Sequence, residues 1–241
     1  MKIAKIVSWL DRTLDVASFD DVSNNGVQIE SSGGGAADVS RVAFAVDASA
    51  RALRAAAAAD AQMLVVHHGI SWGGGVKRIA GGVYGVVRAA MDADIALYAC
   101  HLPLDAHPKL GNNAQLARLL GLSKLRPAFV YHGGVIGFVG ESSRARSVDI
   151  GGRSVDVPRG AVVGVCSGGA GEFAEEAKRL GCGLFVTGEA SWGDVIAAEN
   201  CTMKMVCCGH YETEVFGVRA VAGAMKRALK VDTVDMTEEL R

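Results

Sequence analysis

The strongest constraint on the fold is an alternation of short apolar runs with alanine-rich stretches of helical spacing. A strand followed by a helix, repeated along a chain, is typical of α/β proteins with a largely parallel sheet. The first half of the chain repeats this pattern three times, with strands expected at 41–47, 63–68 and 95–101 and helices at 48–60, 82–94 and 113–122.

A glycine-rich stretch interrupts this pattern in the middle of the chain. Residues 127–158 are rich in glycine and in β-type residues and have no helical period, which predicts strands of a smaller, partly antiparallel region. The α/β pattern then resumes and loosely resembles the first half. The sequence therefore predicts an α/β fold of two related units, with mixed, mostly parallel sheets facing each other. The first unit spans residues 1–126, and residues 127–241 form a β-rich connection plus the second unit of one two-lobed domain.

Composition narrows the class of protein. Half of the residues are hydrophobic and 21% are charged, as in globular proteins. The formal net charge is -1, and no basic run supports a sequence-independent grip on nucleic acid. No apolar run could span a bilayer, and residues 3–14 read as an amphipathic helix, so we expect a cytoplasmic protein without a membrane partner. None of the six cysteines forms a C-x-x-C pair, which predicts reduced, buried thiols.

Polar residues collect where the predicted strands end, which is where ligands sit in open α/β sheets. These residues are His67, His68, His101, Glu189 and His210. Neighbouring side chains of a strand point to opposite faces, so two adjacent histidines can serve one site only if the strand ends there. The glycine-rich segment 69–75 allows the chain to turn at that point.

Carboxylates accompany these histidines. Asp105 lies four residues after His101, and Glu214 lies four residues after His210, where a helix beginning near Tyr211 would bring both side chains together. Imidazole and carboxylate ligands suit a catalytic divalent ion such as zinc, iron or manganese. These histidines and carboxylates are more ligands than one catalytic ion with an open position usually takes from the protein. Two ions bridged by a carboxylate would use all of them. We expect His107 and His132 to be ordinary hydrogen-bonding residues.

Several motifs extend this pattern over nearly the whole chain: SNNGVQIE, VVHHGISW, HLPLDAHPKLGNNAQLA, VCSGGAG, FVTGEAS and CGHYETEVFGVRAV. With these motifs in this order, the chain resembles the Nif-three-like family of dinuclear metal-binding proteins, often described as type-two GTP cyclohydrolase homologues. The likeness is to the short bacterial branch without an inserted middle domain. After TGEAS some relatives carry further histidines, whereas this chain has Trp192 and Gly193.

The resemblance implies two divalent metal ions per subunit. His68 and Asp105 would hold one ion, His67 and His210 would hold the other, and Glu214 would bridge them. It also implies a homo-oligomer, a ring-shaped hexamer whose metal sites face an inner cavity. The reaction implied is metal-dependent hydrolysis of a small-molecule nucleotide; for GTP, water would attack C8 of guanine, with ring opening and release of formate. A non-catalytic metal-binding or regulatory role and a two-metal phosphoesterase stay open.

Other polar residues have two interpretations each. His101 could act as a general acid or base, could orient a metal ligand, or could make a structural hydrogen bond. The turn containing Ser167, Gly168 and Gly169 could cradle a phosphate or could be a tight turn without a ligand, which is the reading we favour. Asn24, Asn25 and Gln28 could line the cleft or build an Asn-Gly turn.

Overall fold

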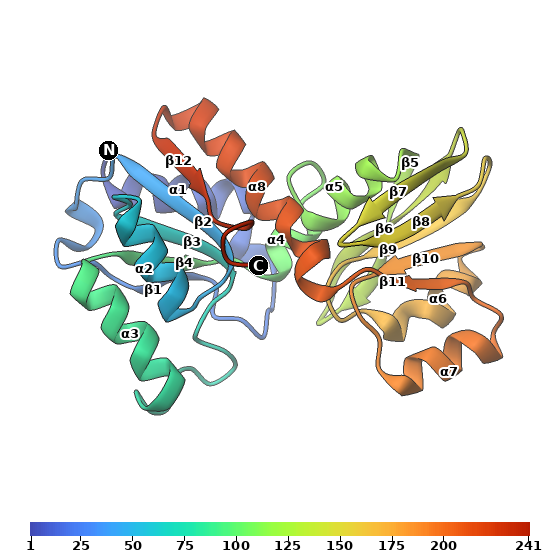
Figure 1. Cartoon of the computed structure of the whole chain (residues 1–241), viewed down its shortest axis with the longest axis horizontal. Coiled ribbons are helices and arrows are strands. Elements are labelled where there is room, and N and C mark those ends of the chain that lie inside the picture. Colours follow the sequence, from blue (N-terminus) through green and yellow to red (C-terminus); the bar gives the residue numbers. More distant parts are fainter. The chain divides into compact units, whose positions relative to one another are not determined.

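A computed structural model describes all residues, Met1–Arg241, and shows two compact units (Figure 1). The first unit comprises Met1–Leu104 and Val218–Arg241, and the second comprises Asp105–Gly217. Each unit holds a five-stranded mixed sheet with helices, which confirms the predicted α/β class. The units differ from the predicted segments 1–126 and 127–241 because the end of the chain returns to the first unit and pairs there as a strand.

The first unit contains most of the elements predicted from the strand–helix pattern. Its elements are α1 (Ile3–Leu14), η1 (Val16–Ser18), β1 (Gly26–Ile29), η2 (Gly34–Ala36), β2 (Arg41–Asp47), α2 (Ala50–Ala58), β3 (Met63–His68), α3 (Gly81–Ala93), β4 (Ala96–Ala99), the last part of α8 (His210–Leu229) and β12 (Asp232–Asp235). The strands lie in the order β1-β4-β3-β2-β12. All neighbouring pairs are parallel except β1 and β4, so β2, β3 and β4 end at one edge of the sheet.

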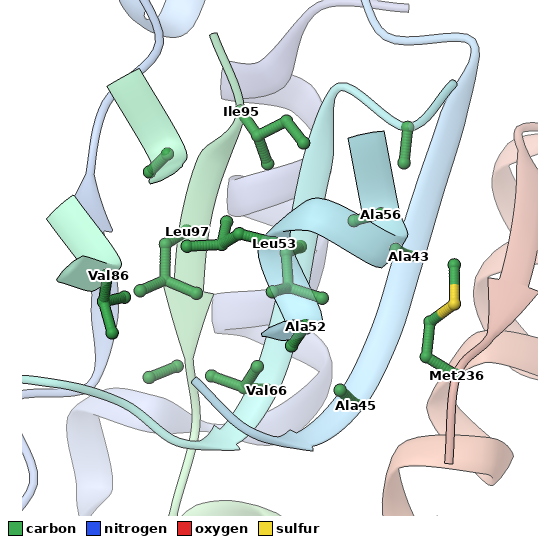
Figure 2. Close-up of a cluster of buried hydrophobic side chains, with 14 residues drawn as sticks. Ala43, Ala45, Ala52, Leu53, Ala56, Val66, Val86, Ile95, Leu97 and Met236 are labelled. Carbon is green, nitrogen blue, oxygen red and sulfur yellow. The ribbon is translucent and has the colours of Figure 1, made fainter. Parts of the chain in front are cut away.

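Alternation along these strands gives the sheet two buried faces. One face contributes Ala45, Val66 and Leu97 to a cluster that packs against α2 and α3 (Figure 2). On the opposite face, the Tyr98 hydroxyl donates to Asp11 of α1 over 2.7 Å. Both faces of a largely parallel sheet are normally covered by helices, and this is why its strands read as continuous apolar runs.

The second unit holds the β-rich stretch and the second run of α/β elements. Its elements are the end of α4 (Leu102–Ala106), α5 (Asn112–Leu119), β5 (Leu122–Tyr131), β6 (Gly134–Ser142), β7 (Arg146–Ile150), β8 (Arg153–Val157), β9 (Val162–Cys166), η3 (Gly171–Phe173), α6 (Ala174–Arg179), β10 (Leu184–Thr187), α7 (Trp192–Asn200), β11 (Met205–Cys207) and the first part of α8. The strand order is β11-β10-β9-β6-β5, with β7 and β8 as a separate hairpin.

The second sheet combines both pairing directions. Strands β9, β10 and β11 are parallel, whereas β6 runs antiparallel to β5 and β9. The helix predicted at 113–122 ends at Leu119, because Gly121 adopts a left-handed φ of 68° and β5 starts immediately afterwards.

Two further sequence expectations concern the whole chain. All six cysteines are free thiols, and four of them are buried. None of the helices combines the length and apolar character that crossing a membrane requires.

Candidate metal centre

Strand β3 ends in the histidine pair, and a different neighbouring segment fixes each ring. His67 Nδ1 lies 3.0 Å from the carbonyl oxygen of Cys100, and His68 Nδ1 lies 2.8 Å from Asp47 Oδ1. Asp47 ends β2 and is the register partner of His68. A carbonyl oxygen only accepts, so His67 Nδ1 carries the proton and Nε2 is the nitrogen suited to bind a metal.

The two rings lie closer together than the alternation of strand side chains predicts. Their centroids are 4.5 Å apart, and the His101 ring lies 5.1 Å from that of His67 and 5.7 Å from that of His68. One ligand atom from each of the three histidines lies within 4.8 Å of the others. The two rings therefore lie side by side at the end of β3, and their Nδ1 atoms bond to different segments, His67 to the residue after β4 and His68 to the end of β2.

A buried carboxylate orients His101. His101 Nδ1 lies 2.9 Å from Asp21 Oδ1, and the side chain of Asp21 is 1% exposed. Asp21 also accepts hydrogen bonds from the backbone N–H groups of Ser23 and Leu102 and from Asn25 Nδ2. Burial raises the pKa of Asp21, but His101 and these donors outweigh it and lower the pKa to about 2. Asp21 is therefore ionised near neutral pH and favours a proton on His101 Nδ1.

The polar residues of the SNNGVQ motif hold the loops around these histidines. Asn25 Oδ1 accepts from the backbone N–H of His101 over 2.8 Å. Gln28 Oε1 accepts from the backbone N–H groups of Ile70 and Ser71, in the segment that follows the histidine pair. In the structure, Asn25 and Gln28 thus position the segments that carry the histidines.

In the second unit, His210 and Glu214 meet at the start of α8. His210 Nδ1 lies 2.7 Å from Glu189 Oε1, and His210 Nε2 lies 3.3 Å from Glu214 Oε1. The side chain of Glu214 is only 4% exposed. The hydrogen bond to Glu214, reinforced by Glu189 and opposed by burial, raises the pKa of His210 to about 9. The predicted i, i+4 contact is confirmed, with the helix beginning at His210 itself.

Asp105, the third predicted ligand of this unit, is held by a buried amide and a hydroxyl. Its Oδ1 accepts from Asn112 Nδ2 over 2.9 Å and from Ser167 Oγ over 3.1 Å. Asn112 Oδ1 in turn accepts from the backbone N–H of Gly217 on α8. This network fixes the Asp105 carboxylate between α5, the turn after β9 and α8.

The glycine-rich turn after β9 supports these ligands. The backbone N–H of Ser167 donates to Asn113 Oδ1, and that of Gly168 donates to Thr213 Oγ1. Protein acceptors therefore occupy both of these N–H groups. Gly168 has φ of 67°, and a Cβ there would overlap a carboxylate oxygen of Glu214. The absence of a side chain at Gly168 therefore leaves room for the Glu214 carboxylate beside the turn.

The other two histidines, His107 and His132, do not have an oxygen acceptor at Nδ1 in the structure's hydrogen bonds. His107 Nδ1 accepts hydrogen bonds from the backbone N–H groups of Lys109 and Leu110, so it closes a turn. His132 is exposed in the turn between β5 and β6. The four histidines of the predicted site instead place an oxygen acceptor at Nδ1, as metal-binding histidines commonly do.

Sequence reasoning missed several residues that support the site: Asp21, Asp47, Asn112 and Asn113. Asp47 could have been found, because it ends a predicted strand beside the one that ends in His68. Asn112 and Asn113 begin α5, the helix that follows Asp105 in the chain, but carry no signal of their own. Asp21 is 80 residues away from His101 in the chain, and only tertiary structure brings them together.

Solved structures share this fold. The chain is similar to a protein named ybgI, described as of unknown function, with a TM-score of 0.84 and 29% identity, covering 98% of both chains. It is also similar to TTHA1606 from Thermus thermophilus, with a TM-score of 0.77 and 30% identity, covering 98% of this chain and 97% of the other.

Sequence comparisons identify the family. A relative from Pyrococcus horikoshii, named GTP cyclohydrolase 1 type 2 homolog, is 39% identical over 95% of both chains. A relative of the same name from Deinococcus radiodurans is 39% identical over 92% of this chain and 88% of its own. The model of Duf34/NIF3 (NGG1p interacting factor 3) matches residues 1–239. The chain therefore belongs to the Duf34/NIF3 family.

Proposed function

We propose that this protein binds a pair of divalent metal ions and uses them to hydrolyse a nucleotide. The observation that carries the proposal is the common orientation of the histidines. Each of His67, His68 and His210 has an oxygen acceptor at Nδ1, which directs metal binding to Nε2. Histidine and carboxylate ligands fit zinc, iron or manganese.

The ligand roles follow the family resemblance. His68 and Asp105 would hold one ion, His67 and His210 would hold the other, and Glu214 would be shared by both. The first unit presents adjacent imidazoles, and the second fixes Asp105 and pairs His210 with Glu214. When bound, such a metal pair supplies Lewis-acid activation of water at neutral pH.

The substrate proposed is GTP, by analogy with the relatives named GTP cyclohydrolase 1 type 2 homolog. Attack of one water at C8 of guanine would open the imidazole ring to a formamide, and a second water would release formate from it. We assign His101 the exchange of protons with the reacting groups through Nε2. Its Nδ1 lies 2.9 Å from Asp21 Oδ1, which orients the ring and leaves Nε2 for this exchange.

The reaction is tested by incubating the metal-loaded protein with GTP and measuring formate and phosphate separately. Formate release supports the cyclohydrolase. Phosphate without formate would replace it with a two-metal phosphoesterase, and neither product would favour a metal-binding or regulatory role. The variant His132→Ala, which alters an exposed histidine outside the site, should retain the wild-type rate.

The metal assignment is tested by measuring bound metal per chain after loading and desalting. We expect about two ions in the wild type, loss of both in Glu214→Ala, and loss of mainly one in Asp105→Ala. The matched control is Glu175→Ala, which removes an exposed carboxylate from α6. Full metal occupancy in Glu214→Ala would refute the bridged pair.

Assembly and cellular location complete the proposal. From the resemblance we propose a homohexamer in the cytoplasm. Light scattering on the purified protein should give a mass of about six times 25.0 kDa. A monomer or dimer at micromolar concentration would contradict the hexamer and would leave the metal assignment intact.

A further inference from the structure

A cavity in the second unit is lined by three arginines and no acidic residue. It has a volume of about 410 Å³, which lies within the range of small-molecule sites. Its lining comprises Pro108, Ala114, Arg118, Gly121, Leu122, Leu125, Ser143, Arg144 and Arg146. None of the proposed metal ligands belongs to this lining. We call it the arginine cavity.

The charges of this cavity are not balanced by the protein. Neither Arg118 nor Arg144 forms a side-chain hydrogen bond or ion pair with another residue. Elsewhere, surface arginines such as Arg41 and Arg88 pair with Asp232 and Asp92. Three guanidinium groups around one cavity, in a chain of net charge -1, create a local positive potential that favours an anion.

One of the three arginines is held in place by the backbone. Arg146 Nη1 donates to the carbonyl oxygen of Leu119 over 2.8 Å, at the end of α5. Gly121, with φ of 68°, lies against the same guanidinium, and a Cβ at this position would overlap it. Arg146 is also the least exposed of the three. The cavity therefore has one preorganised guanidinium and two exposed ones that can close on a ligand.

The chemistry of the lining identifies the ligand class. Guanidinium groups bind phosphate oxygens in a bidentate manner, and the Ser143 hydroxyl adds a neutral donor or acceptor. We propose that the arginine cavity binds the phosphate chain of a small phosphorylated molecule, separately from the metal ligands. Asn112, the residue that holds Asp105, precedes Arg118 by six positions on α5, which corresponds to about 9 Å along the helix axis.

Calorimetric titration of the whole protein with inorganic tripolyphosphate tests the proposal. We expect saturable binding that Arg118→Ala/Arg144→Ala weakens at least tenfold. Both residues are exposed, so this double variant should fold normally. Arg159→Ala, which removes an exposed arginine outside the cavity, controls for the general loss of charge and should change the affinity less than twofold.

Metal-bound phosphate is distinguished by a second variant. Glu214→Ala should keep the tripolyphosphate binding even if it loses its metal. Loss of binding in Glu214→Ala with retention in Arg118→Ala/Arg144→Ala would assign the phosphate to the metal centre and overturn the proposal. Equal weakening in Arg159→Ala, or no saturable binding by the wild type, would overturn it as well.

Discussion

His101 Nδ1 lies 2.9 Å from Asp21 Oδ1, in a pair whose acid is 1% exposed and accepts three further hydrogen bonds. This relationship joins residues 80 positions apart and fixes which nitrogen of His101 faces its neighbours His67 and His68. A second carboxylate, Asp47, does the same for His68. The site is therefore built on acids that bind protein donors as well as on acids proposed to bind metal.

Replacing Asp21 with asparagine should destabilise the fold. The carboxylate now accepts hydrogen bonds at both oxygens, and the amide nitrogen of asparagine would place a donor against one of these donors. We therefore expect a loss of about 2 kcal/mol in the free energy of unfolding. Urea denaturation measures this change. Asp20→Asn alters the neighbouring exposed carboxylate and should stay within about 0.5 kcal/mol of the wild type. Equal stability of both variants would show that the Asp21 network contributes nothing.

The Asp21 carboxylate should also make the free energy of unfolding depend on pH under acidic conditions. Its pKa in the folded protein is about 2, below the ordinary value of 3.8, so its ionised form stabilises the fold. The contribution is present above pH 3.8 and is lost as the pH falls toward 2. Urea midpoints measured across this window should fall less steeply in Asp21→Asn than in the wild type. Parallel curves would contradict the lowered pKa.

His210 should make metal binding strongly dependent on pH. Its pKa in the metal-free protein is about 9, above the ordinary 6.5, so a metal must displace a proton at neutral pH. We expect the apparent zinc affinity to keep rising between about pH 7 and 9, as measured by competition with a chromophoric chelator. Glu189→Gln removes one supporting carboxylate and should move the plateau to lower pH. An affinity already constant above about pH 7 would refute the raised pKa.

The raised pKa also affects the metal-free fold. The protonated His210 stabilises the folded state fully below pH 6.5, and this contribution is lost as the pH rises toward 9. Metal-free protein should therefore become less stable over this range, whereas metal-loaded protein should not. Thermal melts of both forms at a series of pH values test the difference.

Gly168→Ala should damage the site beyond its effect on the backbone. Both Gly168 and Gly160 adopt left-handed φ values, of 67° and 77°, but a Cβ at Gly160 meets no atom within 4 Å. Gly160→Ala thus reports backbone strain alone, of about 1 kcal/mol. Gly168→Ala adds the overlap with Glu214, so we expect a further loss of stability and at least tenfold weaker metal binding. Similar metal affinities in the two variants would show that Glu214 is not constrained by the turn.

Periodicity predicted most of the regular structure. Strands β2 and β3 have the predicted bounds, because strongly apolar segments carry their signal locally. The short strands β1 and β12 were not predicted. β12 has only four residues and no local strand signal that outweighs its charge, and it forms because β2 offers a parallel edge.

The candidate ligands could also be proposed from the sequence: His67 and His68 end a strand, Asp105 lies shortly after one, and Glu214 lies four residues after His210 at the start of a helix. Their environment could not. The acceptors at Nδ1, the hydroxyl beside Asp105 and the glycine beside Glu214 come from segments distant in the chain. The arginine cavity likewise combines α5, β5 and the start of β7, which no local pattern links.

The sequence by itself therefore determined the α/β class, the order of the main elements and the residue types of the site, because periodicity and side-chain chemistry are local properties. Only the tertiary structure decided where the chain divides into units, which nitrogen each histidine presents and which protein donors hold each carboxylate. These properties depend on hydrogen bonds and packing between segments up to nearly two hundred residues apart, as the Arg41–Asp232 contact shows.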